Sequence, residues 1–133
     1  MKLLPGIVIL LMLCLSVFAG CTVSNTNNTI TYEQITAAEA KSIMDSTDDY
    51  ILLDVRTREE YTDGHIAGAL LLPDYEISTK AESIISEKDA LILVYCRSGR
   101  RSKNAASELA TLGYTNVKEF GGIIDWPYNT VTE

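Results

Sequence analysis

One stretch of the chain combines a buried-strand pattern, a cysteine and the start of a helix. Residues 91–95 form an apolar run with no polar interruption, which is typical of a strand buried on both faces of a parallel sheet. From Ala105 onwards, apolar residues recur at helical spacing, and Gly113 stands where such a helix would end. The sequence therefore predicts that Cys96 lies at the carboxyl end of a buried strand, in a short loop that leads into a helix.

The residues that follow this cysteine are basic. Arg97, Arg100, Arg101 and Lys103 gather there, although the whole chain carries a net charge of −7. A helix N-terminus and a tight loop direct N–H groups at an anion, and such a positive site favours the thiolate form of a cysteine. The pattern indicates a thiolate nucleophile for an anionic substrate. The alternative is that Cys96 is an inert core residue and the basic side chains form a solvated face.

Strand and helix patterns alternate along the rest of the chain. Capping boxes at Thr36/Glu39 and Thr57/Glu60 mark two helix starts. The expected strands are residues 30–32, 50–54, 69–72, 91–95 and 116–120. The expected helices are residues 36–44, 57–64, 78–86, the one ending at Gly113, and a short one holding Trp126 after a flexible Gly121-Gly122 turn; residues 129–133 are expected to form a tail. This alternation predicts an α/β fold with a central parallel sheet of about five strands and helices on both faces.

Length and composition limit the possible functions. A chain of 133 residues allows one domain. The acidic balance argues against nucleic-acid binding and against electrostatic docking to anionic lipid. The three cysteines and the single histidine fit no metal-site spacing, so we expect no metal. Cys14 and Cys21 lie within and at the end of the apolar leader, so we expect no structural disulfide. No cofactor is expected either. A monomer is the default expectation.

The N-terminal residues are typical of a targeting segment. Lys2 precedes an apolar core over residues 7–18, and Val17-Phe18-Ala19-Gly20-Cys21 resembles a bacterial lipoprotein box. We therefore expect a signal peptide over residues 1–20, a lipid on Cys21, a flexible tether over residues 21–29 and a globular domain over residues 30–131 outside the cytoplasm. An ordinary signal peptide or an uncleaved anchor are the alternatives, and the choice between inner and outer membrane stays open.

Three motifs resemble the rhodanese (thiosulfate sulfurtransferase) family. The loop from Cys96 to Ser102 is similar to that family's active-site loop. Residues 53–56, 60–61 and 64–69 resemble its amino-terminal signature, and residues 112–117, 121–123 and 126 resemble its carboxyl-terminal one. The motifs occur in the family's order and span about residues 30–131.

The resemblance implies a persulfide mechanism. Cys96 would take a sulfane sulfur from thiosulfate or a persulfide or polysulfide donor and pass it to a thiol or cyanide. The implied substrate-binding residues are Arg97, Ser98, Gly99, Arg100, Arg101 and Ser102. Asp54, Arg56 and Glu60 are expected to pair with one another near the loop in a structural role, with a direct role in sulfur transfer as the alternative. His65 is expected to be a hydrogen-bonded structural residue, with a general base for Cys96 as the alternative.

Two other functions remain open from the sequence. A rhodanese-type domain can serve as a non-catalytic binding module, although the presence of Cys96 and its arginines favours an enzyme. Phosphatases and arsenate reductases of related topology use a longer Cys-x5-Arg loop, whereas Arg101 here stands at Cys-x4-Arg and is followed by Ser102. The shorter loop makes a smaller anion site, which favours sulfur over phosphate. Tyr95 also stands where the phosphatase motif usually has histidine.

Overall fold

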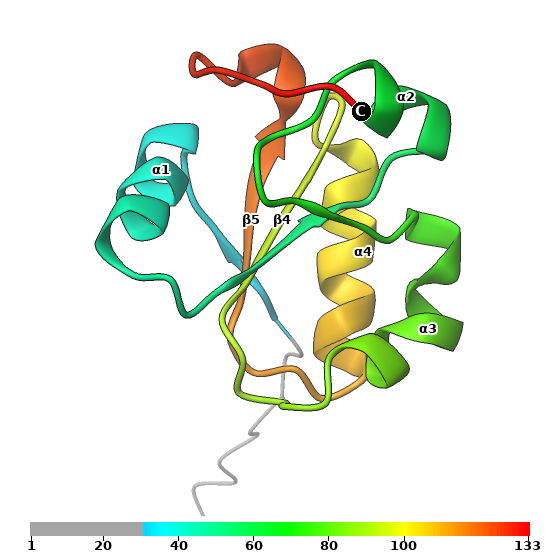
Figure 1. The fold of residues 1–133 in the computed structure, drawn as a ribbon. Coiled ribbons are helices and arrows are strands. Elements are labelled where there is room, and N and C mark those ends of the chain that lie inside the picture. Colours follow the sequence, from blue (N-terminus) through cyan, green and yellow to red (C-terminus); the bar gives the residue numbers. More distant parts are fainter. Residues whose placement is uncertain (1–30) are drawn as a thin grey trace, which may run out of the picture.

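Five parallel strands form the centre of the computed structural model, which describes residues 31–133 (Figure 1). The strands are β1 (Glu33–Gln34), β2 (Ile51–Asp54), β3 (Leu70–Leu71), β4 (Ile92–Cys96) and β5 (Val117–Gly122). Their order across the sheet is β1-β5-β4-β2-β3, and every pairing is parallel. Strand β4 therefore lies at the centre, and all of its residues are buried. This burial explains why an unbroken apolar run predicted the strand.

Helices cover both faces of this sheet, as expected. Helix α1 (Ala37–Ser46) lies on one side, and α3 (Ile77–Ile84) and α4 (Arg100–Thr111) lie on the other (Figure 1). Because neighbouring residues of a strand face opposite ways, the inner strands β2 and β4 each supply side chains to two cores. Leu52 and Leu93 pack on the side of α1, whereas Leu53 and Val94 pack on the side of α3 and α4.

The two helix starts that the capping boxes predicted are confirmed. Thr36 accepts a hydrogen bond from the Glu39 N–H at 3.1 Å at the start of α1. Thr57 accepts one from the Glu60 N–H at 3.3 Å at the start of α2 (Arg58–Asp63). The predicted stop of α4 is also confirmed, since Gly113 follows the helix with φ +98°, a conformation that favours glycine.

The structure corrects the expected edges of the domain. Strand β1 is Glu33–Gln34 instead of residues 30–32, because an exposed edge strand pairs through its backbone with β5 and needs no apolar side chains. Gly121 and Gly122 belong to β5 and do not form a flexible turn. The 3-10 turn Ile123–Asp125 ends before Trp126, and the expected tail is anchored by an antiparallel bridge between Val131 and His65.

Three predictions about the N-terminal segment concern residues outside the described range. They are the signal peptide, the lipidated Cys21 and the tether up to residue 29. Within residues 31–133, no helix has the length and apolar character needed to cross a membrane.

Candidate active site

The Cys96 sulfur lies at the carboxyl end of the central strand, enclosed by the loop that follows it. Cys96 is the last residue of β4 and is 1% exposed. The Gly99 N–H donates a hydrogen bond to Sγ at 3.0 Å, and the thiol donates to Ser102 Oγ at 3.3 Å. Gly99 precedes α4 with φ +100°, a left-handed conformation that lets the loop turn back over the sulfur. The strand, the loop and the helix N-terminus therefore meet at one thiol.

Gly122 holds this loop from the neighbouring strand. It pairs with Cys96 across a register shift between β4 and β5. A Cβ atom on Gly122 would lie 2.1 Å from the Arg97 carbonyl oxygen and 2.6 Å from Ser98 Cα. The Arg97 carbonyl also accepts a hydrogen bond from the Ile124 N–H at 3.2 Å. The backbone of the loop thus packs directly on the end of β5, and only glycine leaves room for it.

The loop presents free positive charge. Arg97, Ser98 and Arg100 are exposed, and within residues 31–133 the two arginine side chains make no hydrogen bond or ion pair. The first turn of α4 holds no acidic residue, and Gly99 provides no side-chain cap. Cations at a helix N-terminus are unfavourable because the macrodipole is positive there. A bound anion would offset this repulsion, so the site is suited to an anionic ligand.

Arg101 differs from its neighbours because it is held in an ion pair. Its Nη1 and Nη2 donate to the two carboxylate oxygens of Glu60 at 2.7 and 2.8 Å. The expectation that Glu60 pairs with Asp54 and Arg56 is therefore wrong, since α2 directs Glu60 towards α4. Hydrogen bonds from Arg101, helped by the Thr57 N–H and opposed by burial, lower the pKa of Glu60 from 4.5 to about 2. Glu60 in turn raises the pKa of Arg101, and Cys96 contributes in the same direction.

Replacing Glu60 with a neutral residue should make the free energy of unfolding less dependent on pH in the acidic range. The folded pKa of Glu60, about 2, lies below its ordinary value of 4.5, so the ion pair stabilises the fold fully above pH 4.5 and loses this effect as the pH falls through 2. We expect Glu60→Gln to lower the free energy of unfolding by about 1 kcal/mol at neutral pH, because solvent screens this partly exposed pair. The free energies of unfolding of the wild type and Glu60→Gln, measured by denaturant titration, should become equal as the pH approaches 2.

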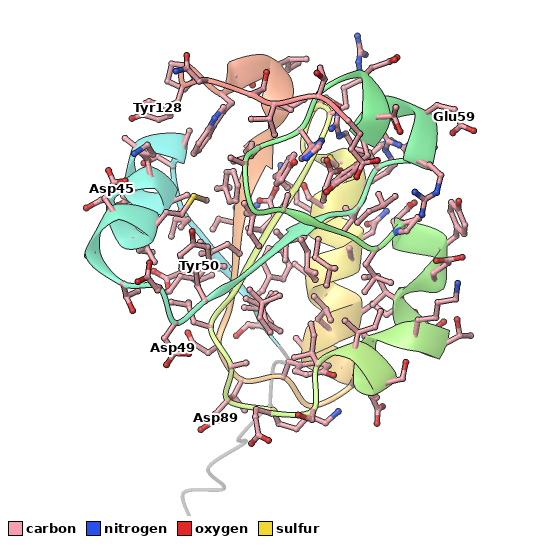
Figure 2. All side chains as sticks on the ribbon, in the orientation of Figure 1. Asp45, Asp49, Tyr50, Glu59, Asp89 and Tyr128 are labelled. Atoms are coloured by element: carbon pink, nitrogen blue, oxygen red, sulfur yellow. The ribbon has the colours of Figure 1, made fainter. Side chains whose placement is uncertain are left out.

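The exposed neighbour Glu59 offers a matched control for this change. Its side chain points away from the domain at the outer edge of α2 (Figure 2). Glu59→Gln should leave the free energy of unfolding nearly unchanged at every pH. A Glu60→Gln difference that stays constant between pH 7 and pH 2 would contradict the assignment of the ion pair.

Asp54 and Arg56 form a buried pair beside the site. Arg56 donates through Nε and Nη2 to the Asp54 carboxylate, with the shortest contact at 2.7 Å, and its Nη2 also donates to the Gly64 carbonyl at 2.6 Å. The Tyr95 hydroxyl donates to Asp54 Oδ2 at 2.7 Å. Burial, followed by the Asp54 charge, raises the pKa of Tyr95 well above its usual value. These contacts connect the ends of β2 and β4 and agree with the predicted structural role.

His65 makes only structural contacts. Its Nδ1 lies 2.8 Å from the Tyr61 carbonyl oxygen, and its ring stacks on the Tyr61 ring at 3.7 Å between centroids. Its backbone forms the bridge to Val131. Neither ring contact involves Cys96, so the geometry favours the structural reading over a general base.

Ser102 lies beneath the sulfur, and a carboxylate lies beneath Ser102. Ser102 is 0% exposed, so its hydroxyl contacts Cys96 and not the open face where a substrate would enter. The same hydroxyl donates to Glu119 Oε1 at 2.6 Å, and Glu119 is 2% exposed. Glu119 is not among the residues predicted from the sequence. Its signal is an acidic residue at an inward position of β5, two residues after the buried Val117.

A cavity of about 490 Å³ opens beside the loop, with Arg56, Arg97, Ile124, Trp126 and Tyr128 on its walls. Trp126 packs edge-on against Tyr128, with ring centroids 4.8 Å apart, and is 8% exposed. Its indole N–H is buried without a partner in the described part of the chain. The wall also carries the acidic residues Glu60 and Asp63, and the cavity gives a second molecule room to approach the loop. Among residues 31–133, no group of three histidine, cysteine or acidic residues is placed to hold a metal ion.

The parallel sheet and the basic cysteine loop at the end of its central strand agree with a rhodanese-like domain. Residues 36–127 match the Rhodanese-like domain family, and the chain belongs to this family. Solved structures similar to this chain confirm the predicted single-domain rhodanese fold. A rhodanese-related protein from Thermoplasma volcanium has a TM-score of 0.67 and 34% sequence identity, covering 77% of this chain and 100% of that one.

Several relatives of this chain carry sulfurtransferase names. The thiosulfate sulfurtransferase PspE of Escherichia coli is 36% identical over 73 residues, which cover 55% of this chain and 70% of that protein. A sulfurtransferase of Allochromatium vinosum is 41% identical over 81 residues, which cover 60% and 74%. A structure described as a rhodanese with anions from E. coli has a TM-score of 0.60 and 32% identity, covering 63% of this chain and 99% of that one. Sulfurtransferase activity in general is therefore supported.

Proposed function

We propose that this protein transfers a sulfane sulfur from thiosulfate, or from a persulfide or polysulfide donor, to a thiol or cyanide through a persulfide on Cys96. The observation that carries the proposal is the Cys96 sulfur at the carboxyl end of β4, with the Gly99 N–H 3.0 Å away and the unpaired Arg97 and Arg100 on the exposed side of the same loop. The similarity to a rhodanese described as solved with anions supports the anionic donor.

The chemistry requires only groups that the loop provides. The Cys96 thiolate attacks the outer sulfur of thiosulfate, a new S–S bond forms, and the bond to the sulfonate sulfur breaks, so that sulfite leaves. Arg97 and Arg100 attract the dianion, and the Gly99 N–H stabilises negative charge on the sulfur. The thiol or cyanide acceptor then attacks the outer sulfur of the persulfide from the adjoining cavity and regenerates Cys96.

Intact-mass measurement tests this proposal directly. The full chain, purified in mild detergent, is incubated with thiosulfate. We expect a gain of one sulfur atom, removed by cyanide or a reducing thiol and absent in Cys96→Ser. If the mass stays constant with thiosulfate and with polysulfide while Cys96 still titrates as a free thiol, the enzyme proposal fails. A non-catalytic binding module would then be the better description.

We also propose that the domain works outside the cytoplasm, held at a membrane by a lipid on Cys21. The lipoprotein-box pattern that ends at Cys21 supports this location. Expression in a bacterial host with radiolabelled palmitate should label the wild-type chain and leave Cys21→Ser unlabelled. Equal labelling of both proteins, or none of the wild type, would count against the lipid anchor.

A further inference from the structure

A buried hydrogen-bond chain leads from the Cys96 sulfur into the sheet. The thiol donates to Ser102 Oγ at 3.3 Å, and Ser102 donates to Glu119 Oε1 at 2.6 Å. The exposed fractions of Cys96, Ser102 and Glu119 are 1%, 0% and 2%. A nucleophile is thus one hydroxyl group away from a buried carboxyl group that the proposed mechanism does not use.

The donor and acceptor roles in these hydrogen bonds follow from the single hydrogen of the Ser102 hydroxyl group. Glu119 Oε1 accepts from both Ser102 and the Gly121 N–H at 2.8 Å, so this oxygen acts as an acceptor. A hydroxyl group has one hydrogen. The carbonyls of Gly99 and Gly121 are also within reach of Ser102, at 3.1 and 3.4 Å, but the carboxylate contact is the shortest. Ser102 therefore presents a lone pair to the sulfur, which suits a thiol and not a thiolate.

Glu119 is also the unneutralised anion of the site. Two nearby cations are already paired, since Arg101 binds Glu60 and Arg56 binds the Asp54 carboxylate, whereas Arg97 and Arg100 are exposed on the outer side of the loop. Asp74 acts electrostatically on Arg101 from the turn Asp74–Glu76. Lys118, next to Glu119 in sequence, pairs with Glu33 of the edge strand. Within residues 31–133, Glu119 has no cationic partner, so its charge acts on Ser102 and, through it, on Cys96.

We propose that Glu119, acting through Ser102, is a positioning residue that sets the protonation of Cys96. As a carboxylate it accepts the Ser102 hydroxyl proton in a hydrogen bond, so that Ser102 offers only a lone pair to the sulfur and the resting Cys96 is held as a thiol.

This inference rests on the proposed role of Cys96 as the nucleophile, but its test does not require sulfur transfer. The full chain is alkylated with iodoacetamide across a pH series. Modification of Cys96 is followed by mass spectrometry of the tryptic peptide of residues 89–97, which contains neither Cys14 nor Cys21. We expect Glu119→Gln to reach half of its maximal alkylation rate about one pH unit below the wild type, because a neutral amide removes a charge that opposes the thiolate.

Two further variants separate the hydrogen-bond chain from a general charge effect. Glu108→Gln makes the same charge change farther along α4 and should not move the profile. In a Ser102→Ala background, the Glu119→Gln shift should shrink, because the carboxyl group then acts on the sulfur only through space. A folded Glu119→Gln protein with an unchanged profile, or an undiminished shift without Ser102, would overturn the proposal.

An infrared measurement keeps the proposal testable if Glu119→Gln does not fold. The S–H stretching band of Cys96 is isolated as the difference between the wild type and Cys96→Ser at neutral pH. A hydrogen-bonded thiol band is expected, and a band typical of a free thiol, or none, would contradict the inference. A shifted alkylation profile without any sulfur gain from thiosulfate or polysulfide would refute the sulfurtransferase proposal alone. Sulfur gain with an unmoved profile would refute only the role of Glu119.

Discussion

Replacing Cys96 with serine should abolish transfer of sulfur from thiosulfate to cyanide, with a loss of at least about a thousandfold in kcat/KM. The hydroxyl group is a far weaker nucleophile towards sulfur and forms no persulfide. The buried site should accept the change without loss of fold, because an oxygen can keep the hydrogen bonds that Sγ makes with Gly99 and Ser102. Thiocyanate formation with the wild type and the variant at equal concentration measures the effect.

Cys21→Ser is the control for this experiment, because it removes a different cysteine from the same chain. Purified in the same detergent, it should keep the wild-type rate of thiocyanate formation. Substantial turnover by Cys96→Ser, together with a loss in Cys21→Ser, would transfer the chemistry to the other cysteine and contradict the assignment of the site.

Adding one methyl group at Gly122 should damage both stability and activity. The new Cβ would lie 2.1 Å from the Arg97 carbonyl oxygen and 2.5 Å from its carbonyl carbon, and backbone atoms cannot move aside as a flexible side chain can. We expect Gly122→Ala to lower the free energy of unfolding by about 3 kcal/mol. Because the displaced loop carries Gly99 and the arginines, sulfur transfer should fall at least about a hundredfold.

Gly68→Ala supplies a matched comparison for this prediction. Gly68 has φ +81°, but a Cβ there would meet no atom within 4 Å. The change should therefore cost only about 1 kcal/mol of backbone strain and leave sulfur transfer intact. Denaturant unfolding and thiocyanate formation are measured on both variants. Equal behaviour of Gly68→Ala and Gly122→Ala would mean that close packing of the loop on β5 does not control the site.

The conformation of Gly122 could not be predicted from the local sequence. A Gly-Gly pair before a short helix has the local signature of a turn, and it was predicted as a flexible one. In the structure both residues extend β5, because the loop after β4 approaches the backbone of Gly122 from the neighbouring strand. The cause lies more than twenty residues away along the chain, so no local pattern contains it.

The charge pairs show the same limit. The sequence predicts ion pairs among Asp54, Arg56 and Glu60. The pair of Asp54 with Arg56 is confirmed, and these two residues are only two positions apart. The pairing of Glu60 with Arg101 depends on how α2 meets α4. Likewise, Glu119 acquires its place under Ser102 only when β5 lies beside β4.

The sequence by itself determined the features with local or periodic causes. Alternating apolar patterns specified an α/β sheet with helices on both faces, two capping boxes specified helix starts, and the apolar run before Cys96 specified a buried central strand. Only the tertiary structure decided which side chains surround the sulfur. Hydrogen bonds and close contacts depend on distances of a few ångströms between segments far apart in sequence, and the order β1-β5-β4-β2-β3 brings those segments together.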